Sequence, residues 1–566
     1  MKVSGRKTGS ALSHAPDDWN AVDWRRVERN VRGMQIRIAK ATREGKWRRV
    51  KALQRMLTRT LSAKLYAVRR VTQNQGARTA GVDRELWDSP ESRRHAVDRL
   101  KRRGYRPLPL RRVFIPKANG KERPLGIPTM HDRAMQALYL LALEPVAEST
   151  SDPNSYGFRS HRSTADAMSQ IFVSMSQKGS AQWVLEADIK GCFDHIDHDW
   201  LERNVPMDTA ILRKWLKAGL IYQGQLQVTE AGTPQGGIIS PTLANVTLNG
   251  LERELIEHLG ARFGIAKTKK LKIHVVRYAD DFVITSDSQE VLVNEVRPWI
   301  EAFLAVRGLQ LSEEKTRITH INQGFDFLGW NFRKYVGKLL IKPSKKNAQA
   351  FYRKVAETIS GNKTVKQEDL IQLLNPMLRG WAQYHSPVVA KQAYSRMEHL
   401  VFQRLWRWSK RRHPQKGADW VRKKYFHSIG DRQWVFAVPV VKRDGSKGLL
   451  ELYQISGTVI KRHLKIKADF NPFDPMWEQY GEKLRQDRMW ESMRYRRRWS
   501  KLYMSQGGLC AHCGTALTDE TGWHDHHLEY RMHGGKDTLS NRVLLHPHCH
   551  QQVHAGKLAV TKPVLF

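Results

Sequence analysis

The sequence contains few cysteines and no long apolar run, and each shortage excludes a class of protein. Only four of its 566 residues are cysteine, and three of them (Cys510, Cys513 and Cys549) fall in the last 57 residues. That clustering suits a metal site in a reducing compartment better than a disulfide framework. No apolar stretch reaches the ~18 residues that span a bilayer, and the N-terminus does not have the layout of a signal peptide. We therefore expect a multidomain protein of a reducing, cytoplasmic compartment.

Acidic residues are also scarce relative to basic ones. The 96 Lys and Arg against 55 Asp and Glu give a formal net charge of +41, and basic residues occur along nearly the whole chain. A charge this large opposes compaction unless a polyanion neutralises it. Nucleic acid is the polyanion that fits best, and an anionic membrane surface is the competing interpretation. We expect binding that weakens strongly with salt.

Apolar spacing predicts a basic helical start followed by a mixed region. Apolar residues recur at helical intervals from Trp24 to Ile38, and a second helix is expected from about Trp47 to Val71. Strand-like runs alternate with helices over residues 80–345, which is typical of an α+β fold. Within that region, a hairpin is expected around Asn119–Gly120.

The chain then becomes helical over residues 346–428, where one apolar face is expected. The residues of that face are Met397, Leu400, Val401, Leu405 and Trp408. A hairpin around Asp444–Gly445 and a very basic helical stretch over 480–500 follow. The last 60 residues are rich in His and Cys.

Two adjacent carboxylates, Asp280 and Asp281, lie in the otherwise apolar stretch "RYADDFVITS". Like charges beside an apolar wall repel each other, and a bound divalent cation removes the conflict. Asp188 ends another apolar strand, in "LEADIKGCFDHIDH". A third carboxylate on a neighbouring strand would complete a two-metal cage that activates a 3′-hydroxyl for phosphoryl transfer. For the Asp pair alone, a polar hairpin tip remains the simpler interpretation.

These segments resemble the palm motifs of reverse transcriptases: "YADD" (278–281), "DIKGCF" (188–193) and "GTPQGGIISPTLANV" (232–246). The resemblance implies that Asp188, Asp280 and Asp281 are the catalytic Mg²⁺ ligands. It also implies nucleotide-binding roles for four other residues. Phe193 would exclude a ribose 2′-OH, Gln235 would contact the dNTP, and Lys117 and Arg123 of the fingers-like hairpin "IPKANGKERPLGIP" would grip the triphosphate.

A further series of motifs is similar to the group II intron-encoded reverse transcriptases. "YGFRSHRSTADA" (156–167), "LSEEKTRI" (311–318) and "FDFLGWNF" (325–332) occur in order behind a basic N-terminal extension. The stretch "LNPMLRGWAQYH" (374–385) resembles their thumb, the maturase domain. The resemblance implies that its Arg and Lys residues contact intron RNA, whereas a solvated surface is the alternative.

The C-terminal residues carry two pairs of soft metal ligands with two-residue spacing, "CAHC" (510–513) and "HPHC" (546–549). This spacing predicts a structural tetrahedral Zn²⁺ site. Its ligands would be Cys510, Cys513, His546 and Cys549. A catalytic cysteine is a weak alternative, because no thiol stands apart.

A second group of histidines surrounds these pairs. His550 and His554 are four residues apart, so they share a helix face and could hold another metal with His526. His527 could then activate water as a general base, and Asn541 could orient the backbone around it. The order HH, GG, N, CH and H resembles the HNH endonucleases, which implies these same roles. The departures are Tyr530, where many have Pro, and His546 in place of a Cys. A zinc-stapled fold that only binds DNA is the alternative.

The combined resemblance implies an α+β multidomain protein: a right-hand polymerase with an antiparallel palm sheet, an α-helical thumb and a small zinc-containing ββα-metal HNH domain. The expected domains are an N-terminal extension (1–75), fingers and palm (76–345), thumb (346–430), a basic DNA-binding region (431–500) and the HNH domain (501–566).

The implied function is target-primed reverse transcription, intron RNA maturation and DNA nicking. The implied partners are intron RNA, target DNA and dNTPs, without a membrane, in a bacterial or organellar nucleoid-associated setting. The implied cofactors are Mg²⁺, Zn²⁺ and a divalent metal in the HNH site. A maturase with a vestigial polymerase, or a retron or phage-defence reverse transcriptase, remains an alternative. Cys192 has no assigned role, and the oligomeric state is open.

Overall fold

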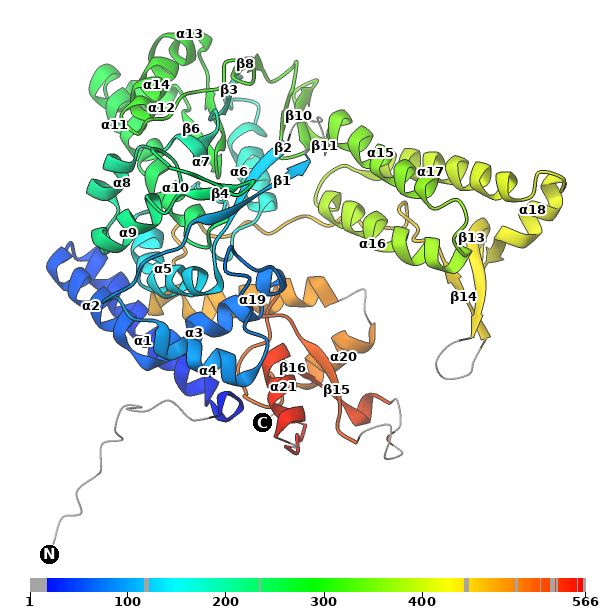
Figure 1. Cartoon of the computed structure of the whole chain (residues 1–566). Coiled ribbons are helices and arrows are strands. Elements are labelled where there is room, and N and C mark those ends of the chain that lie inside the picture. The colour runs from blue at the N-terminus through cyan, green and yellow to red at the C-terminus, as the bar shows by residue number, and fades with distance from the viewer. Residues whose placement is uncertain are drawn as a thin grey trace, which may run out of the picture.

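The computed structural model describes residues 18–116, 122–233, 236–441, 447–493, 497–519, 521–529, 535, 538–556 and 558–562. A main body of helices and sheets carries a long helical arm on one side (Figure 1). The C-terminal module lies below the body, beside the N-terminal helices. None of the helices within the described ranges combines the length and apolar content that a bilayer crossing requires.

The N-terminal helices pack on a central helix of the body. They are η1 (Trp19–Ala21), α1 (Trp24–Arg43), α2 (Trp47–Arg59), α3 (Leu61–Thr72), η2 (Gln75–Arg78) and α4 (Pro90–Arg99). Of these, α1, α2 and α3 pack on α5 (Met130–Thr150), whereas α4 packs on α3 and η1. The single helix expected from Trp47 to Val71 is wrong, because the chain breaks at Thr60. Thr60 adopts an extended conformation and its hydroxyl accepts from the Ala63 amide, which caps a new helix.

The expected hairpin is present as strands β1 (Leu110–Pro116) and β2 (Glu122–Ile127), paired antiparallel with Ile115 opposite Arg123. Its turn, including Asn119 and Gly120, lies outside the described residues. β1 also pairs in parallel with β4 (Leu220–Tyr222), and β4 pairs with β5 (Gln225–Gln227), so the sheet order is β2-β1-β4-β5.

A second four-stranded sheet, fully antiparallel, forms the middle of the body in the order β6-β7-β3-β8. Its strands are β3 (Trp183–Asp188), β6 (His274–Tyr278), β7 (Asp281–Ser286) and β8 (Arg317–His320). Alternate side chains enter two different cores. Leu185 and Phe282 join the core of the N-terminal half, whereas Val184 and Val283 join the core shared with the arm. This sheet therefore links the two halves of the molecule.

Helices occupy the chain between and after these strands. They are α6 (Thr164–Met175), α7 (Cys192–His195), α8 (His198–Asn204), α9 (Thr209–Leu216), α10 (Ser240–Leu248), α11 (Leu251–Phe263), α12 (Ile265–Lys270), α13 (Gln289–Val291), η3 (Leu292–Val296) and α14 (Arg297–Ala305).

The arm follows a three-stranded sheet of β9 (Phe325–Phe327), β10 (Trp330–Tyr335) and β11 (Lys338–Pro343). Its helices are α15 (Lys345–Gly361), α16 (Gln367–His385), α17 (Lys391–Arg412) and α18 (Ala418–Tyr425), followed by strands β12 (Phe426–Ile429), β13 (Arg432–Val441) and β14 (Lys447–Glu451). The predicted face of α17 is buried except for Leu400, which lies half-buried at its edge. The hairpin expected around Asp444–Gly445 is formed by β13 and β14, although its turn lies outside the described residues.

The chain returns from the arm along the body to the C-terminal module (Figure 1). Asp166 in the first turn of α6 anchors this return segment, because it accepts from His463, from the Ile466 amide and from Arg488. After η4 (Pro475–Trp477), α19 (Glu478–Met493) and α20 (Arg497–Ser505), the module consists of β15 (His524–His527), η6 (Leu539–Asn541), β16 (Arg542–Leu545) and α21 (Pro547–Ala555). Gln552 ties it to the N-terminal segment by donating to the Asn20 carbonyl over 2.7 Å.

Candidate active sites

The central sheet brings the three predicted aspartates to one end. β6 and β7 are joined by a tight turn at Ala279 and Asp280, and Asp281 begins β7. β3 pairs with β7 in a register that sets Asp188 directly opposite Asp281. Asp188, Asp280 and Asp281 therefore meet at one end of the sheet, and we refer to these three residues as the acidic cluster.

The electrostatics of the acidic cluster fit a cation site. Burial, a hydrogen bond with Asp188 and repulsion by Asp280 raise the pKa of Asp281 to about 7. Burial and repulsion by Asp188 also raise the pKa of Asp280. The Lys315 ammonium lies 2.7 Å from Asp188 Oδ2. The positive charges of Arg123 and Lys315 act against this rise, because each lowers the pKa of Asp280. A divalent cation would neutralise the remaining repulsion, as carboxylate oxygens are ligands that Mg²⁺ prefers.

A buried guanidinium fixes the turn of the acidic cluster. Arg277 is only 2% exposed, and burial lowers its pKa to about 10. It donates to the Ala279 carbonyl over 3.2 Å and to Asn245 Oδ1 over 3.1 Å. Asn245 in turn donates to the Gly157 carbonyl over 2.8 Å. These contacts hold Ala279 in its left-handed conformation, at φ 59°.

Sequence reasoning missed Arg277, Asn245 and Lys315 as parts of this site. The signal for Arg277 was a charged residue inside an apolar strand, immediately before the Asp pair. Asn245 and Lys315 lie inside two of the motifs that carry the resemblance, "GTPQGGIISPTLANV" and "LSEEKTRI". The sequence alone does not reveal which residues their side chains contact.

The predicted nucleotide-binding residues are only partly described. Lys117 and Gln235 lie outside the described residues. Arg123 lies on β2, where its charge reaches Asp280. Phe193 lies on α7 directly after β3, is 8% exposed, and its carbonyl accepts from the Thr233 amide over 2.7 Å. Cys192 beside it is buried, and burial together with the charge of Asp280 raises its pKa to about 12.

The C-terminal module holds two groups of metal-ligand atoms, each gathered within 4.8 Å. Among the described residues, the carboxylate oxygens of the acidic cluster do not gather within the same distance of one another. The first group is Cys510, Cys513, His546 and Cys549. Cys513 Sγ lies 3.3 Å and Cys549 Sγ 3.9 Å from His546 Nδ1, while His546 Nε2 contacts the Ala516 carbonyl at 3.1 Å. The Ala516 carbonyl fixes the orientation of the His546 ring. Three thiols and one imidazole arranged in this way fit a tetrahedral metal ion.

The second group joins His526 of β15 to His550 and His554 of α21. The Nε2 atoms of His550 and His554 are 3.1 Å apart. Burial and repulsion by His554 lower the pKa of His550 to about 4, so its ring is neutral near pH 7 and can bind a metal. His524, which sequence reasoning missed, has its ring centroid 5.1 Å from that of His550. The alternating "HDHH" pattern was its signal.

His527 and Asn541 lie next to this group. His527 ends β15 opposite Arg542, where the strand passes into a loop. The Asn541 side chain accepts from the Glu529 amide over 2.8 Å and donates to the Glu529 carbonyl over 3.0 Å. Asn541 therefore holds the backbone that follows His527. Tyr530 lies outside the described residues.

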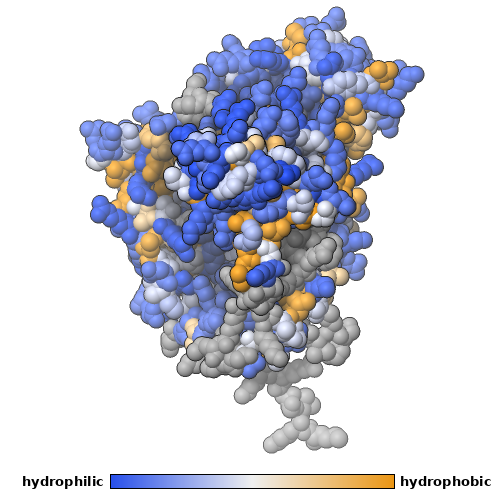
Figure 2. Space-filling model, turned by 90° about the vertical axis from the view of Figure 1, so that its right-hand side faces the viewer, coloured by the Kyte–Doolittle hydropathy of each residue, from blue (hydrophilic) through white to orange (hydrophobic). Residues whose placement is uncertain are grey.

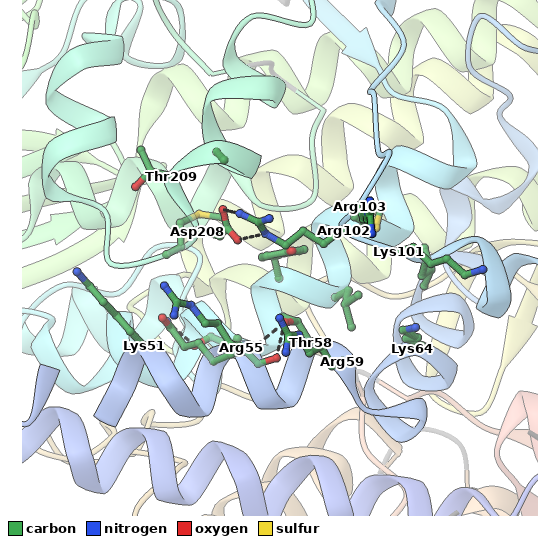
Figure 3. A pocket seen from close by; sticks show the side chains of 18 residues that line it. Lys51, Arg55, Thr58, Arg59, Lys64, Lys101, Arg102, Arg103, Asp208 and Thr209 are labelled. Carbon is green, nitrogen blue, oxygen red and sulfur yellow. Dashed lines mark hydrogen bonds and ion pairs between the residues drawn. The ribbon is translucent and has the colours of Figure 1, made fainter. Parts of the chain in front are cut away.

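A basic cavity of about 800 Å³ lies among α2, α5 and the segments after α4 and before α9 (Figure 3). Its cations are Lys51, Arg55, Arg59, Lys64, Lys101, Arg102 and Arg103. Arg102 is paired with Asp208 at 2.5 Å. Within the described ranges, the other six have no carboxylate at ion-pair distance, so their charge is open to a polyanion.

The arm presents aromatic side chains together with cations. Trp420 and Trp434 are 38% and 42% exposed. Lys424 lies 4.8 Å from the Trp420 ring and Arg422 lies 5.5 Å from the Trp434 ring. Seen from the side of the arm, the surface is predominantly hydrophilic, with apolar residues in small separate groups (Figure 2). Such a surface suits nucleic acid, because rings stack on bases while cations contact phosphates.

Four family profiles match the chain in order. "N-terminal domain of reverse transcriptase" matches residues 19–100, and "Reverse transcriptase (RNA-dependent DNA polymerase)" matches 115–332. "Group II intron, maturase-specific domain" matches 348–426, and "HNH endonuclease" matches 510–556. The matched ranges include the three aspartates of the acidic cluster and both groups of metal-ligand residues in the C-terminal module.

Individual proteins also match parts of this chain. Protein YkfC of Escherichia coli (strain K12) is 35% identical over 304 residues, covering 46% of this chain and 78% of that protein. Group II intron-encoded protein LtrA of Lactococcus lactis subsp. cremoris is 33% identical over 327 residues. That match covers 47% of this chain and 54% of LtrA, so it spans about half of that relative. Maturase-like protein 1 of Euglena gracilis is 25% identical, covering 64% and 76%.

Proposed function

This chain belongs to the group II intron-encoded proteins, with reverse transcriptase, maturase and HNH endonuclease domains, and we propose how its residues divide that work. The acidic cluster carries RNA-templated DNA synthesis. The histidine group of the C-terminal module nicks target DNA. The basic cavity and the arm hold the intron RNA. A nick supplies the primer end that a polymerase needs, so the combination supports target-primed reverse transcription.

In the polymerase site, Asp188, Asp280 and Asp281 would hold Mg²⁺. When bound, the ions would activate the primer 3′-hydroxyl and stabilise the leaving pyrophosphate. Arg123 attracts the triphosphate, together with Lys117. Phe193 blocks a 2′-OH, and Gln235 contacts the nucleotide. Lys315, already bound to Asp188, supplies a further positive charge beside the departing phosphates. The observation that supports this proposal most strongly is the β3–β7 register that opposes Asp188 to Asp281.

In the nuclease site, His526, His550 and His554 would hold a divalent ion that polarises the scissile phosphate. His527 would take the proton from the attacking water, while Asn541 keeps its loop in place. Cys510, Cys513, His546 and Cys549 would hold a structural Zn²⁺ that joins the start of the module to α21. The ββα arrangement of β15, β16 and α21, with the histidines facing one another, is the supporting observation.

Two substitutions test this division of labour. Asp280→Asn should abolish extension of a DNA primer on an RNA template, and His527→Ala should abolish nicking of target DNA. Each variant should keep the other activity, so each serves as the control for the other. Normal extension by Asp280→Asn would overturn the polymerase assignment. Loss of both activities in either folded variant would count against separate sites.

The basic cavity is a candidate binding site for RNA. We propose that intron RNA neutralises the basic cavity, because six of its seven cations have no carboxylate partner among the described residues. Purifying the protein from its host and sequencing the bound RNA tests this directly. Recovery of one folded intron supports the proposal, whereas a random RNA population would contradict it.

A further inference from the structure

An exposed phenylalanine beside the acidic cluster has an unfavourable backbone conformation. Phe158 has φ 58°, in the left-handed region that bulky side chains rarely adopt, and its side chain is 52% exposed. Neither core packing nor local backbone preference favours phenylalanine at this position. Strained residues of this kind cluster where a structure contacts ligands.

Buried ion pairs and hydrogen bonds fix the loop that carries Phe158. Arg159 pairs with the buried Glu148 at 2.7 Å and donates to the Asp152 and Ser155 carbonyls, each over 2.8 Å. Arg162 pairs with the same Glu148 at 2.5 Å. The exposed ring of Phe158 is therefore presented on a preorganised support.

The same loop contacts the acidic cluster through its backbone. A Cβ atom added at Gly157 would lie 2.2 Å from the Ala279 amide nitrogen, so the two segments touch without room for a side chain. Phe158 directly follows Gly157 and therefore lies beside the turn that carries Asp280.

On its other side, Phe158 packs against the residue assigned to 2′-OH exclusion. The rings of Phe158 and Phe193 meet edge to face, with centroids 6.1 Å apart and planes at 77°. Phe193 is only 8% exposed, against 52% for Phe158. A nucleotide that reaches this corner would therefore contact the Phe158 ring over a larger area than Phe193.

We propose that Phe158 is a specificity-determining residue of nucleotide selection. Its ring forms one apolar wall with Phe193, against which the sugar of the incoming nucleotide packs. It also supports the edge of Phe193 in the position where a 2′-OH would clash. This inference rests on the proposed polymerase function and adds a second residue to its selection of dNTPs over NTPs.

The sharpest test is Phe158→Gly, because glycine adopts φ 58° without strain and the substitution removes the whole side chain together with its ring. We expect the KM for dNTPs to rise about tenfold while kcat stays within about threefold of the wild type. Discrimination against NTPs should fall about tenfold, because Phe193 loses its support. Phe158→Tyr, which keeps the ring, should retain both values. Steady-state primer extension with dNTPs and with NTPs measures these quantities.

Val173→Ala on α6 is the matched control, because Val173 is 58% exposed yet lies outside this wall. Unchanged KM and discrimination in Phe158→Gly would overturn the inference, and so would a fall in kcat alone. If Phe158→Gly fails to fold, the same comparison is made with Phe158→Leu. An inactive wild type would instead overturn the proposed polymerase function.

Discussion

The acidic cluster and the C-terminal module are both candidate metal centres, but they are assembled in opposite ways. The aspartates come from strands far apart in the sequence and meet only because β3 pairs with β7 in one register. In the module, Cys510 and Cys513 lie in one turn, while His546, Cys549, His550 and His554 lie within about two turns of one chain segment. Local spacing builds most of the second centre, whereas the whole body builds the first.

The two centres also differ in charge. The acidic cluster concentrates negative charge, so burial and mutual repulsion raise the pKa values of Asp280 and Asp281. In the histidine group, burial and repulsion lower the pKa of His550 and keep its ring neutral. Oxygen donors favour Mg²⁺, whereas nitrogen and sulfur donors favour Zn²⁺ and other transition metals. Perturbing one centre should therefore leave the other intact.

We expect the largest effect from removing one thiol of the Cys and His group in the C-terminal module. Cys513→Ser should lose target-DNA nicking completely, because the binding energy of a structural metal is folding energy for a small module. Primer extension should stay within about twofold of the wild type. Nicking assays together with zinc analysis measure this. His512→Ala, in the same turn but outside the ligand group, should nick normally, and loss of primer extension in Cys513→Ser would contradict the separation of the centres.

The next effect concerns the support of the acidic cluster. Arg277→Met leaves the Ala279 carbonyl and Asn245 Oδ1 buried without their donor, which costs ~1–3 kcal/mol per group in unfolding free energy. Small displacements of reacting groups can cost about 100-fold in rate. We therefore expect primer extension to fall about 100-fold, with nicking unchanged. Arg297→Met is the matched control, because Arg297 forms an exposed ion pair with Glu301. A wild-type rate of primer extension by Arg277→Met would show that the turn at Ala279 and Asp280 does not need the Arg277 side chain.

A pH series should test the raised pKa of Asp281 in the acidic cluster. Protons must leave Asp281 before Mg²⁺ binds, so with a pKa of about 7 the half-saturating Mg²⁺ concentration should fall about tenfold from pH 6 to pH 8. In metal-free protein, the folded state binds more protons than the unfolded state between pH 4 and 7. The contribution of Asp281 to stability is therefore largest at low pH and is lost as the pH rises towards 7. A half-saturating Mg²⁺ concentration that does not change with pH would contradict a protonated Asp281.

The smallest effect should come from the basic cavity, which belongs to neither centre. Replacing both Arg55 and Arg59 by Gln should weaken RNA binding several-fold at moderate salt. The plot of log affinity against log salt should become shallower by one to two counterions, at about 0.7 per phosphate contact for single strands. Arg102→Gln is the matched control, because Asp208 already neutralises Arg102 in the same cavity. An unchanged salt slope in the double variant would exclude phosphate contacts there.

Several features followed from local sequence. Helical spacing predicted α1 and the apolar face of α17, and turn residues predicted the β1–β2 and β13–β14 hairpins. The two-residue spacing of the Cys and His pairs predicted the group around Cys513. In the helices, the hairpins and each Cys or His pair, the interacting residues are neighbours in the chain, so their separation in sequence determines their separation in space. The two pairs themselves lie more than 30 residues apart, and the fold of the module brings them together.

Only the tertiary structure decided the rest. The break at Thr60 is the exception, because it comes from a local cap in which the Thr60 hydroxyl accepts from the Ala63 amide. The clamp from Arg277 through Asn245 to Gly157, the Lys315 contact with Asp188 and the exposed ring of Phe158 each join segments that no periodicity connects. The amino-acid sequence determined which side chains were available as ligands. The pairing of the sheet and the burial around it determined which of them meet, and with what charge.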